Sequence, residues 1–263
     1  MDLFVRKGKR LLGLTPPGQE LLGVVERMLL DASNIRHIAE AFSQRDQGQL
    51  IVATTHTQAR YVLPPVVTRF KAAYPKVQLV LHQASPDEVV QLLVAGEADI
   101  GIATEALQGV SALIAFPYYQ WHHTVVVPHG HPLLDSQPLT LPALVAHPIV
   151  TYHDGFTGRK RIDRSFQAAG LQPDVVMTAL DSDVIKTYVE LGLGVGITAS
   201  MAFNPDRDRD LRAVDSAHLF EANTTWLAVR DGHYLRDFAY RFIELCSPEL
   251  AEPAVRAALQ GNA

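Results

Sequence analysis

Long apolar stripes and short β-branched runs divide this chain into one long helix followed by alternating strands and helices. Between Leu21 and Phe42, apolar residues recur every three to four positions, which predicts an amphipathic helix of more than twenty residues. The segment LTPPGQELL before it is a helix start, with Thr15 as N-cap and Pro16 at the first helical position. A helix of this length exceeds what a small domain encloses, so we expect its stripe to pack against the same helix of a second chain.

After a break at 45–49, strand and helix patterns alternate. The first set has strands at 50–54, 77–83 and 98–104, with helices at 63–75 and 85–97. The second set has strands at 148–152, 174–180 and 195–200, with helices at 158–170 and 182–194. This alternation predicts parallel sheets covered by helices. A strand-rich stretch at 116–127 separates the sets, so we expect two α/β lobes, and a last helix at 233–246 that returns to the first lobe.

Composition narrows the class of protein. The 263 residues are 48% apolar and 19% charged, which is typical of a globular chain with one large domain or two small ones. The formal net charge of −5 does not favour nucleic-acid binding by the chain as a whole. Cys246 is the single cysteine, which excludes an intrachain disulfide. No segment reaches the about 18 apolar residues of a membrane span, and the N-terminus lacks a signal-peptide pattern, so we expect a cytoplasmic protein without a membrane partner.

Hydroxyl-bearing residues gather where predicted strands end. The first strand runs into Thr54, Thr55, His56, Thr57 and Gln58; Thr104 ends a second strand, and Thr157 lies between a strand and a helix in the other set. In open α/β sheets, ligands bind beyond the carboxyl ends of the strands, where helix starts offer unpaired N–H groups. Such a cup of neutral donors can hold an anion or carboxylate without a cation. The same threonines also suit helix caps and turns, and this reading stays open for each of them singly.

Other motifs point away from enzymes, metals and nucleotides. The glycines of GLGVG, residues 192–196, follow a helix and precede a strand, which is the reverse of a dinucleotide-binding loop. The histidines of 122–132 lack carboxylate or cysteine companions and have turn composition. No nucleophile elbow, phosphate loop or paired cysteine motif occurs. We therefore predict no catalytic residue, no metal site and no cofactor.

Several segments resemble the LysR-type transcriptional regulators, and within them the CysB-like activators of sulfur assimilation and cysteine biosynthesis. The general signature comprises LTPPGQELL, RFKAAYP, ADIGIAT, HPL and VELGLGVGITAS, and the more specific one ATTHTQARY, IATEAL, YHDGFTGR and DSDVIKTYVELGLGVG. The resemblance extends over about residues 3 to 247.

The resemblance implies a two-lobed effector domain like the type 2 periplasmic binding proteins, preceded by a linker helix. It assigns 1–15 to the last strands of a DNA-binding wing, 16–46 to the linker and dimerisation helix, 47–119 with 224–248 to lobe I, 120–223 to lobe II and 249–263 to a tail. It implies that Thr55, Thr57, Gln58, Thr104 and Thr157 bind the effector in the cleft, with Trp121 at the crossover as part of the pocket wall. It also implies an effector of the acetylserine, sulfate or thiosulfate class, a dimer or tetramer, and RNA polymerase as a partner.

The start of the chain departs from the family pattern. Family members begin with a winged helix-turn-helix of roughly sixty residues, and here only its last strands have a counterpart. We therefore expect specific DNA binding of the full-length protein alone. The basic cluster of Arg6, Lys7, Lys9 and Arg10 around Gly8 is expected to keep weak, salt-sensitive contact with phosphates.

Two other function classes share a two-lobed α/β fold. A solute-binding protein for a small oxyanion or amino-acid derivative is the alternative, which the linker helix and the missing signal-peptide pattern count against. An enzyme with two α/β lobes is a third, which the lack of an acid–base or metal constellation counts against.

Overall fold

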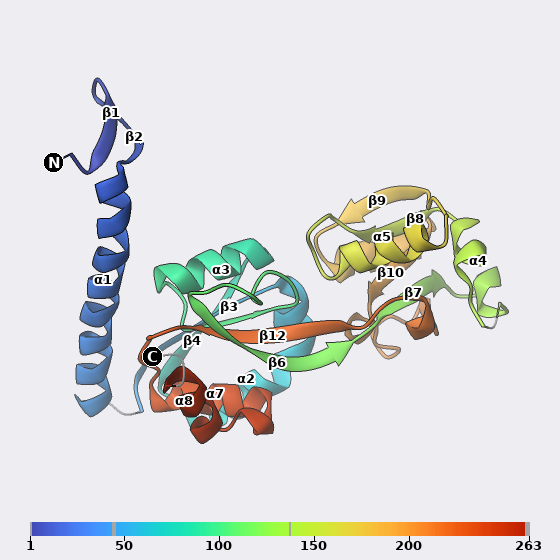
Figure 1. Cartoon of the computed structure of the whole chain (residues 1–263). Coiled ribbons are helices and arrows are strands. Elements are labelled where there is room, and N and C mark those ends of the chain that lie inside the picture. Colours follow the sequence, from blue (N-terminus) through green and yellow to red (C-terminus); the bar gives the residue numbers. More distant parts are fainter. Residues whose placement is uncertain (1, 44–45, 137, 261–263) are drawn as a thin grey trace.

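The computed structural model describes residues 2–43, 46–136 and 138–260, with the side chains of 40–43 left out of the description. A strand hairpin and a long helix precede two α/β lobes, which lie side by side and are joined by extended strands (Figure 1). Among the described residues, the strands beyond the hairpin form two five-stranded sheets, one in each lobe.

The N-terminal elements follow the predicted pattern. Strands β1 (Phe4–Lys7) and β2 (Arg10–Leu14) pair antiparallel around Gly8. Helix α1 extends over 28 residues, Pro16–Ser43. The Thr15 hydroxyl accepts a hydrogen bond from the Gly18 amide at 3.2 Å, which confirms Thr15 as N-cap. The Phe42 side chain and residue 45, which belong to the predicted stripe and break, lie outside the described part.

Lobe I contains a sheet with strand order β4-β3-β5-β12-β6. Its strands are β3 (Gly48–Thr54), β4 (Val77–Gln83), β5 (Ile100–Ala103), β6 (Leu113–Trp121) and β12 (Asn223–Arg230). Alternate residues of β3 enter two cores: Leu50 and Val52 pack with α2 (Pro64–Ala73) and α7 (Asp237–Cys246), whereas Ala53 packs with α3 (Pro86–Ala95). Helices therefore cover both faces of this sheet.

Local sequence rules account for these helix ends. Ser85 and Glu88 form a reciprocal capping box at the start of α3, and Gly96 ends the helix in a left-handed conformation with φ 74°. Helix α7 begins at Asp237, four residues after the predicted start, because Gly232 with φ 71° turns the chain first. In that turn, the His233 amide donates to the Arg230 carbonyl.

Lobe II contains the second sheet, with order β11-β7-β10-β8-β9. Its strands are β7 (His123–Pro128), β8 (Ile149–Tyr152), β9 (Val175–Ala179), β10 (Val195–Ala199) and β11 (Leu211–Val214). Its helices are α4 (Leu141–Val145), α5 (Arg159–Ala168) and α6 (Ser182–Glu190). Ile162, Phe166, Ile185 and Val189 of the last two helices are buried in the lobe II core.

Both sheets are mixed, whereas the strand–helix alternation predicted parallel sheets. The predicted strands pair parallel, as β3 with β4 and β5, and β8 with β9 and β10. The strands that pair antiparallel are β6, β7, β11 and β12. Strands β6 and β12 lie side by side between the lobes, with β6 leading toward lobe II and β12 leading back to lobe I (Figure 1). The chain changes sheet between Trp121 and His123 and returns at Asn223, whereas the predicted boundaries were 119/120 and 223/224.

The C-terminal segment adds to lobe I. The sequence suggested a tail at 249–263, but Glu252–Gln260 form helix α8, and its Val255 is fully buried in the lobe I core. The apolar residues of α8 lie on one face of the helix because they are three and four positions apart, at Val255, Ala258 and Leu259. In the described part of the chain, none of the helices combines the length and apolar character needed to cross a bilayer.

Candidate functional site

The segment after β3 places its polar side chains at the edge of the lobe I sheet. The Thr54 hydroxyl donates to the Ile102 carbonyl at 2.9 Å, so this residue is used inside the sheet. The chain then turns into a short π-helix, Gln58–Val62, with the Ala59 amide bonded to the Thr55 carbonyl at 3.1 Å. Thr55, Thr57 and Gln58 are all buried. The hydroxyl of Thr55 makes no hydrogen bond with the described residues, so it is available to a ligand.

Thr157 faces this segment from lobe II. It lies in the loop between β8 and α5, and its hydroxyl oxygen is 3.4 Å from that of Thr57. Its φ of 44° lies in the left-handed region, which a β-branched residue rarely adopts. Such strain persists where surrounding contacts fix the backbone, and it is frequent at ligand sites.

His123 fixes the loop that carries Thr157. Its Nε2 lies 2.9 Å from the Thr157 carbonyl, an acceptor only, so Nε2 carries the proton and Nδ1 accepts from the Asn223 amide at 3.4 Å. Burial lowers the pKa of His123 to about 4, so the ring is neutral near pH 7. Next to Thr157, a Cβ on Gly158 would lie 2.8 Å from the His123 Cε1, which explains why a glycine stands there.

The other predicted ligand residues converge on Thr225 of β12. Its hydroxyl accepts from the Trp121 indole at 3.0 Å and from the Gln58 amide at 3.4 Å, and it lies 3.3 Å from the Thr104 hydroxyl. In the contact with Thr104 either hydroxyl can be the donor, so Thr225 joins Trp121, Gln58 and Thr104 in one polar network. Tyr119 donates to the other end of the Gln58 amide at 2.7 Å, which fixes the orientation of this side chain.

A cavity of about 320 Å³ opens between the lobes beside these groups. It is lined by Thr55, His56, Thr57, Gln83, Ala84, Ser85, Glu88, Phe156, Thr157, Leu180 and Asp181. Of the predicted ligand residues, three line this cavity, and Gln58, Thr104 and Trp121 are not among its described lining. The predicted set therefore divides into a cavity wall and a supporting network behind it.

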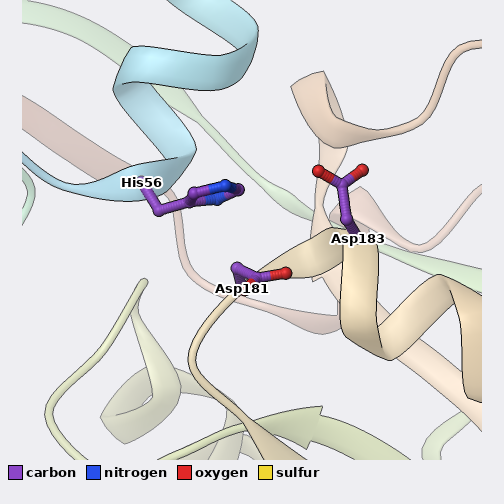
Figure 2. A group of neighbouring side chains, drawn as sticks. All are labelled: His56, Asp181 and Asp183. Carbon is purple, nitrogen blue, oxygen red and sulfur yellow. The ribbon is translucent and has the colours of Figure 1, made fainter. Parts of the chain in front are cut away.

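A cluster of His56, Asp181 and Asp183 lies at the rim. Figure 2 shows the His56 ring from lobe I beside the two aspartates at the start of α6, and their ligand atoms lie within 4.8 Å of one another. This spacing would suit a metal ion, but the aspartates have protein partners. Asp181 caps α6 by accepting from the Val184 amide at 2.9 Å, and Asp183 accepts from Tyr61 and Arg60. Hydrogen-bond donors and cations of the protein therefore already neutralise and bind the two carboxylates that would otherwise hold an ion.

Asp183 joins the lobes at this rim. The Tyr61 hydroxyl lies 2.7 Å and the Arg60 Nε 3.1 Å from its carboxylate, while Lys186 lies 3.6 Å away on its own helix. Burial acts to raise the pKa of Asp183, but these donors outweigh it and hold the pKa below the ordinary value. The carboxylate is therefore charged near pH 7 and bonded across the cleft.

Glu105 is a second acidic contact between the lobes, and it was not predicted. It follows Thr104 after β5 and accepts a short hydrogen bond from the Gly158 amide. Burial raises the pKa of Glu105 to about 6, although the amides of Gly158 and of Glu105 itself and the charges of Arg161 and Lys160 act to lower it. Thr225 also escaped prediction. The signal that was present for both is their place at strand ends of the same sheet edge, in IATEAL and NTTWL.

The basic cluster lies apart from the cleft. Arg6, Lys7, Lys9 and Arg10 are exposed on the β1–β2 hairpin, at the end of α1 remote from the lobes (Figure 1).

Known proteins similar to this chain are transcriptional regulators. The HTH-type transcriptional regulator SsuR of Burkholderia cenocepacia is 53% identical over 260 residues, which cover 99% of this chain and 84% of that protein. The regulator CysB of the same organism is 47% identical over 263 residues, covering 100% of this chain and 84% of the relative. The regulator Cbl of Escherichia coli K12 is 49% identical over 251 residues, covering 95% of this chain and 79% of the relative.

A solved structure supports the same fold. The cofactor-binding domain of the Cbl transcriptional regulator superposes with a TM-score of 0.78 at 47% identity, covering 81% of this chain and 93% of that domain. The family described as LysR substrate binding domain matches residues 43–251, which include every cavity residue named above. The chain therefore belongs to the LysR family of transcriptional regulators, and residues 43–251 are its effector-binding domain.

Proposed function

We propose that this chain is the effector-sensing and oligomerising part of a regulator of sulfur assimilation and cysteine biosynthesis. In this proposal an acetylserine-type or sulfate-type ligand binds between the lobes, DNA and RNA polymerase are partners of the full-length protein, and the exposed stripe of α1 joins copies of the chain. Its similarity to the regulators CysB, Cbl and SsuR supports the assignment to sulfur metabolism.

One observation carries the proposed ligand site. The hydroxyls of Thr57 and Thr157 come from opposite lobes and lie 3.4 Å apart. They line one cavity with the hydroxyl of Thr55, which has no hydrogen-bond partner among the described residues. Three neutral donors can bind the oxygens of a carboxylate or sulfate without a protein cation. A cavity of about 320 Å³ is at the lower end of the range for small-ligand sites, which suits a metabolite of this size.

The proposed mechanism is a shift between lobe arrangements. A ligand that bonds Thr57 and Thr157 together binds more tightly when the lobes are close, so it increases the population of that arrangement. Because β6 and β12 connect the lobes, a change in lobe angle reaches lobe I and from there α1.

The proposal is tested by isothermal titration calorimetry with O-acetyl-L-serine, N-acetyl-L-serine and sulfate. We expect saturable binding of at least one of them to the wild-type chain, and a loss of at least tenfold in affinity in the double variant Thr55→Val/Thr57→Val. The control is Thr68→Val, which removes an exposed hydroxyl on α2 that is bonded only to its own helix among the described residues. Equal affinity in the double variant would contradict the cleft assignment.

A further inference from the structure

A buried hydrogen bond joins the two sheets where the chain crosses between the lobes. His123 is the first residue of β7 and pairs with Ala199 in the lobe II sheet, whereas Asn223 is the first residue of β12 and pairs with Trp121 in the lobe I sheet. The Asn223 amide donates to the His123 Nδ1 at 3.4 Å, and both side chains are buried. Because the chain passes from one sheet to the other at these two positions, a change in lobe angle acts directly on this hydrogen bond.

The same histidine holds the loop that carries Thr157. Its Nε2 donates to the Thr157 carbonyl at 2.9 Å. The rings of Trp121 and Phe220 pack edge-on against the imidazole, with centroid distances of 5.0 and 5.7 Å, and so fix its plane. The φ of 44° at Thr157 is a strained conformation that persists only where neighbouring contacts enforce it, and the hydrogen bond from His123 is one of these contacts.

Asn223 contacts the next residue of that loop. Its Oδ1 is buried and has no hydrogen-bond partner among the described residues. A Cβ on Gly158 would lie 2.4 Å from this oxygen, so the two groups are in close contact. The Gly158 amide itself donates to Glu105. The loop is therefore held by His123 from lobe II, and by Asn223 and Glu105 from lobe I.

Packing alone does not explain a polar pair at this crossover. Burial of an imidazole and an amide costs free energy, which a hydrogen bond of 3.4 Å and an unpaired Oδ1 only partly offset. An apolar pair of similar volume would avoid that cost. Hydrophobic contacts are non-directional, however, whereas hydrogen bonds require a defined geometry. What the polar pair supplies is therefore a fixed direction of the His123 ring.

We propose that His123 and Asn223 are positioning residues that couple the angle between the lobes to the place of the Thr157 hydroxyl. This inference rests on the proposed function and adds two residues outside the described cavity lining. When the lobes turn apart, Asn223 moves with lobe I and the His123 ring loses its fixed direction. The Thr157 carbonyl then loses its donor, and the loop relaxes from the left-handed conformation. Lobe closure and ligand binding thereby favour each other.

The experiment is a double-mutant cycle between His123 and Thr157. Calorimetry measures the affinities of O-acetyl-L-serine, N-acetyl-L-serine and sulfate for the wild type, His123→Leu, Thr157→Val and the double variant. Leucine removes the donor at position 123, and valine removes the hydroxyl at position 157. We expect each single variant to weaken binding at least threefold, and the double variant to lie within twofold of the weaker single one. A double variant that shows the product of the two losses would overturn the inference, because His123 would then act independently of Thr157.

A conservative variant and a control separate positioning from packing. His123→Gln keeps one N–H donor and one acceptor in the side chain, so we expect an affinity within twofold of the wild type. An affinity as low as that of His123→Leu would overturn the inference. The control is Thr124→Val on the same strand, which removes the hydrogen bond from Thr124 to the Val214 carbonyl. We expect wild-type affinity in this variant, and a loss equal to that of His123→Leu would show that any lost hydrogen bond on β7 weakens binding, which also overturns the inference.

Further outcomes separate this inference from the proposed function. If His123→Leu does not fold, Asn223→Ala takes its place in the cycle. We then expect at least a twofold loss that disappears when Thr157 is valine, and wild-type affinity in Asn223→Ala would overturn the inference. Absence of binding by all three ligands to the wild type would overturn the proposed function together with this inference. Binding to the wild type with undiminished affinity in His123→Leu overturns the inference alone.

Discussion

The hydroxyl of Thr57 lies 3.4 Å from the hydroxyl of Thr157, although the two residues are 100 positions apart in the chain. This distance is at the upper limit for a hydrogen bond between hydroxyls, so the direct contact is weak. An oxygen atom placed beside both groups would accept two shorter hydrogen bonds in exchange. The pair is therefore easily opened in favour of a ligand.

The strained backbone of Thr157 leads to a first prediction. In Thr157→Gly the left-handed φ of 44° is no longer unfavourable, which offsets the glycine's larger unfolded-state entropy. We expect the free energy of unfolding, from urea denaturation, to stay within about 1 kcal/mol of the wild type. Effector affinity should fall at least threefold. A loss of unfolding free energy well above about 1 kcal/mol in Thr157→Gly would show that the hydroxyl supports the fold. The comparison is Thr157→Val, which also lacks the hydroxyl but keeps the strained backbone.

The raised pKa of Glu105 predicts a specific pH dependence of stability. The pKa is about 6 in the folded chain against an ordinary 4.5, so the folded state holds the proton more tightly than the unfolded state. The resulting stabilisation is complete below about pH 4.5 and is lost as the pH rises through 6, a difference of about 2 kcal/mol. We expect the wild type to lose about this much more unfolding free energy than Glu105→Gln between pH 4.5 and 7. Parallel pH profiles would contradict the prediction.

The hydrogen bond between Tyr61 and Asp183 joins the two lobes, so we expect it to favour the arrangement in which they lie close together. Tyr61→Phe removes the 2.7 Å hydrogen bond across the cleft, a contribution of about 1 kcal/mol for a partly exposed charged acceptor. Without ligand, the lobes should then separate more often. Small-angle X-ray scattering should show a larger radius of gyration, which returns toward the wild-type value with effector. Tyr188→Phe, on the exposed side of α6, should scatter like the wild type.

The faces of α1 predict how copies of the chain associate. Asn34 and His37 contact the turn after β12, whereas Met28, Leu29 and Ile35 are 66%, 66% and 69% exposed. At about 100° per residue Met28 and Ile35 point away from the face that carries Asn34 and His37, so they are open to another helix. Leu29 lies nearer to lobe I and lines a groove with Val90 and Val94 of α3.

We expect the double variant Met28→Glu/Ile35→Glu to form a smaller oligomer than the wild type at the same concentration. Light scattering after size-exclusion chromatography measures this mass. Arg27→Glu, which changes charge outside the stripe, should keep the wild-type mass. An unchanged mass in the double variant would assign the association to another surface.

The basic hairpin predicts weak contact with DNA backbones. If Arg6, Lys7, Lys9 and Arg10 each neutralise one phosphate, the logarithm of affinity for random duplex DNA falls with the logarithm of salt at a slope of about −4 or less steep. Replacing all four by alanine should bring the slope close to zero. Fluorescence anisotropy in a salt series provides the measurement, and a slope unaffected by the four substitutions would place the contact elsewhere.

Elements with local signals could be predicted, and those that depend on distant partners could not. Helix α3 was predictable because Ser85, Pro86 and Gly96 set both of its ends within the segment itself. Strand β12 was not placed, because its partners β5 and β6 lie more than a hundred residues earlier and pair with it antiparallel. The sequence suggested a tail where helix α8 forms, because its few apolar residues are stabilised by packing against α7, which sequence patterns do not reveal.

The same distinction holds for the cleft. Thr55, Thr57 and Thr157 could be selected because hydroxyls at strand ends follow a general rule of α/β sheets. The direction of each side chain decides whether a selected residue lines the cavity. Thr104 and Gln58 point to Thr225 and do not line it, and the sequence gives no sign of this direction. For Glu105 the position after a strand was the single signal, and it was too weak to select the residue, because a lone acidic residue after a strand is common on surfaces. Its burial arises only when Gly158 approaches from the other lobe.

Strand β12 also connects the proposed ligand site with helix α1. Thr225 near its start is bonded to the ligand network, and beyond its end Gly232 and Tyr234 are bonded to Asn34 of α1, at 2.8 and 2.9 Å. An eight-residue strand spans about 27 Å and, held between β5 and β6, can tilt but cannot stretch. If a ligand displaces Thr225 in the proposed mechanism, we expect β12 to carry that displacement to Asn34 and to change the angle of α1 relative to lobe I.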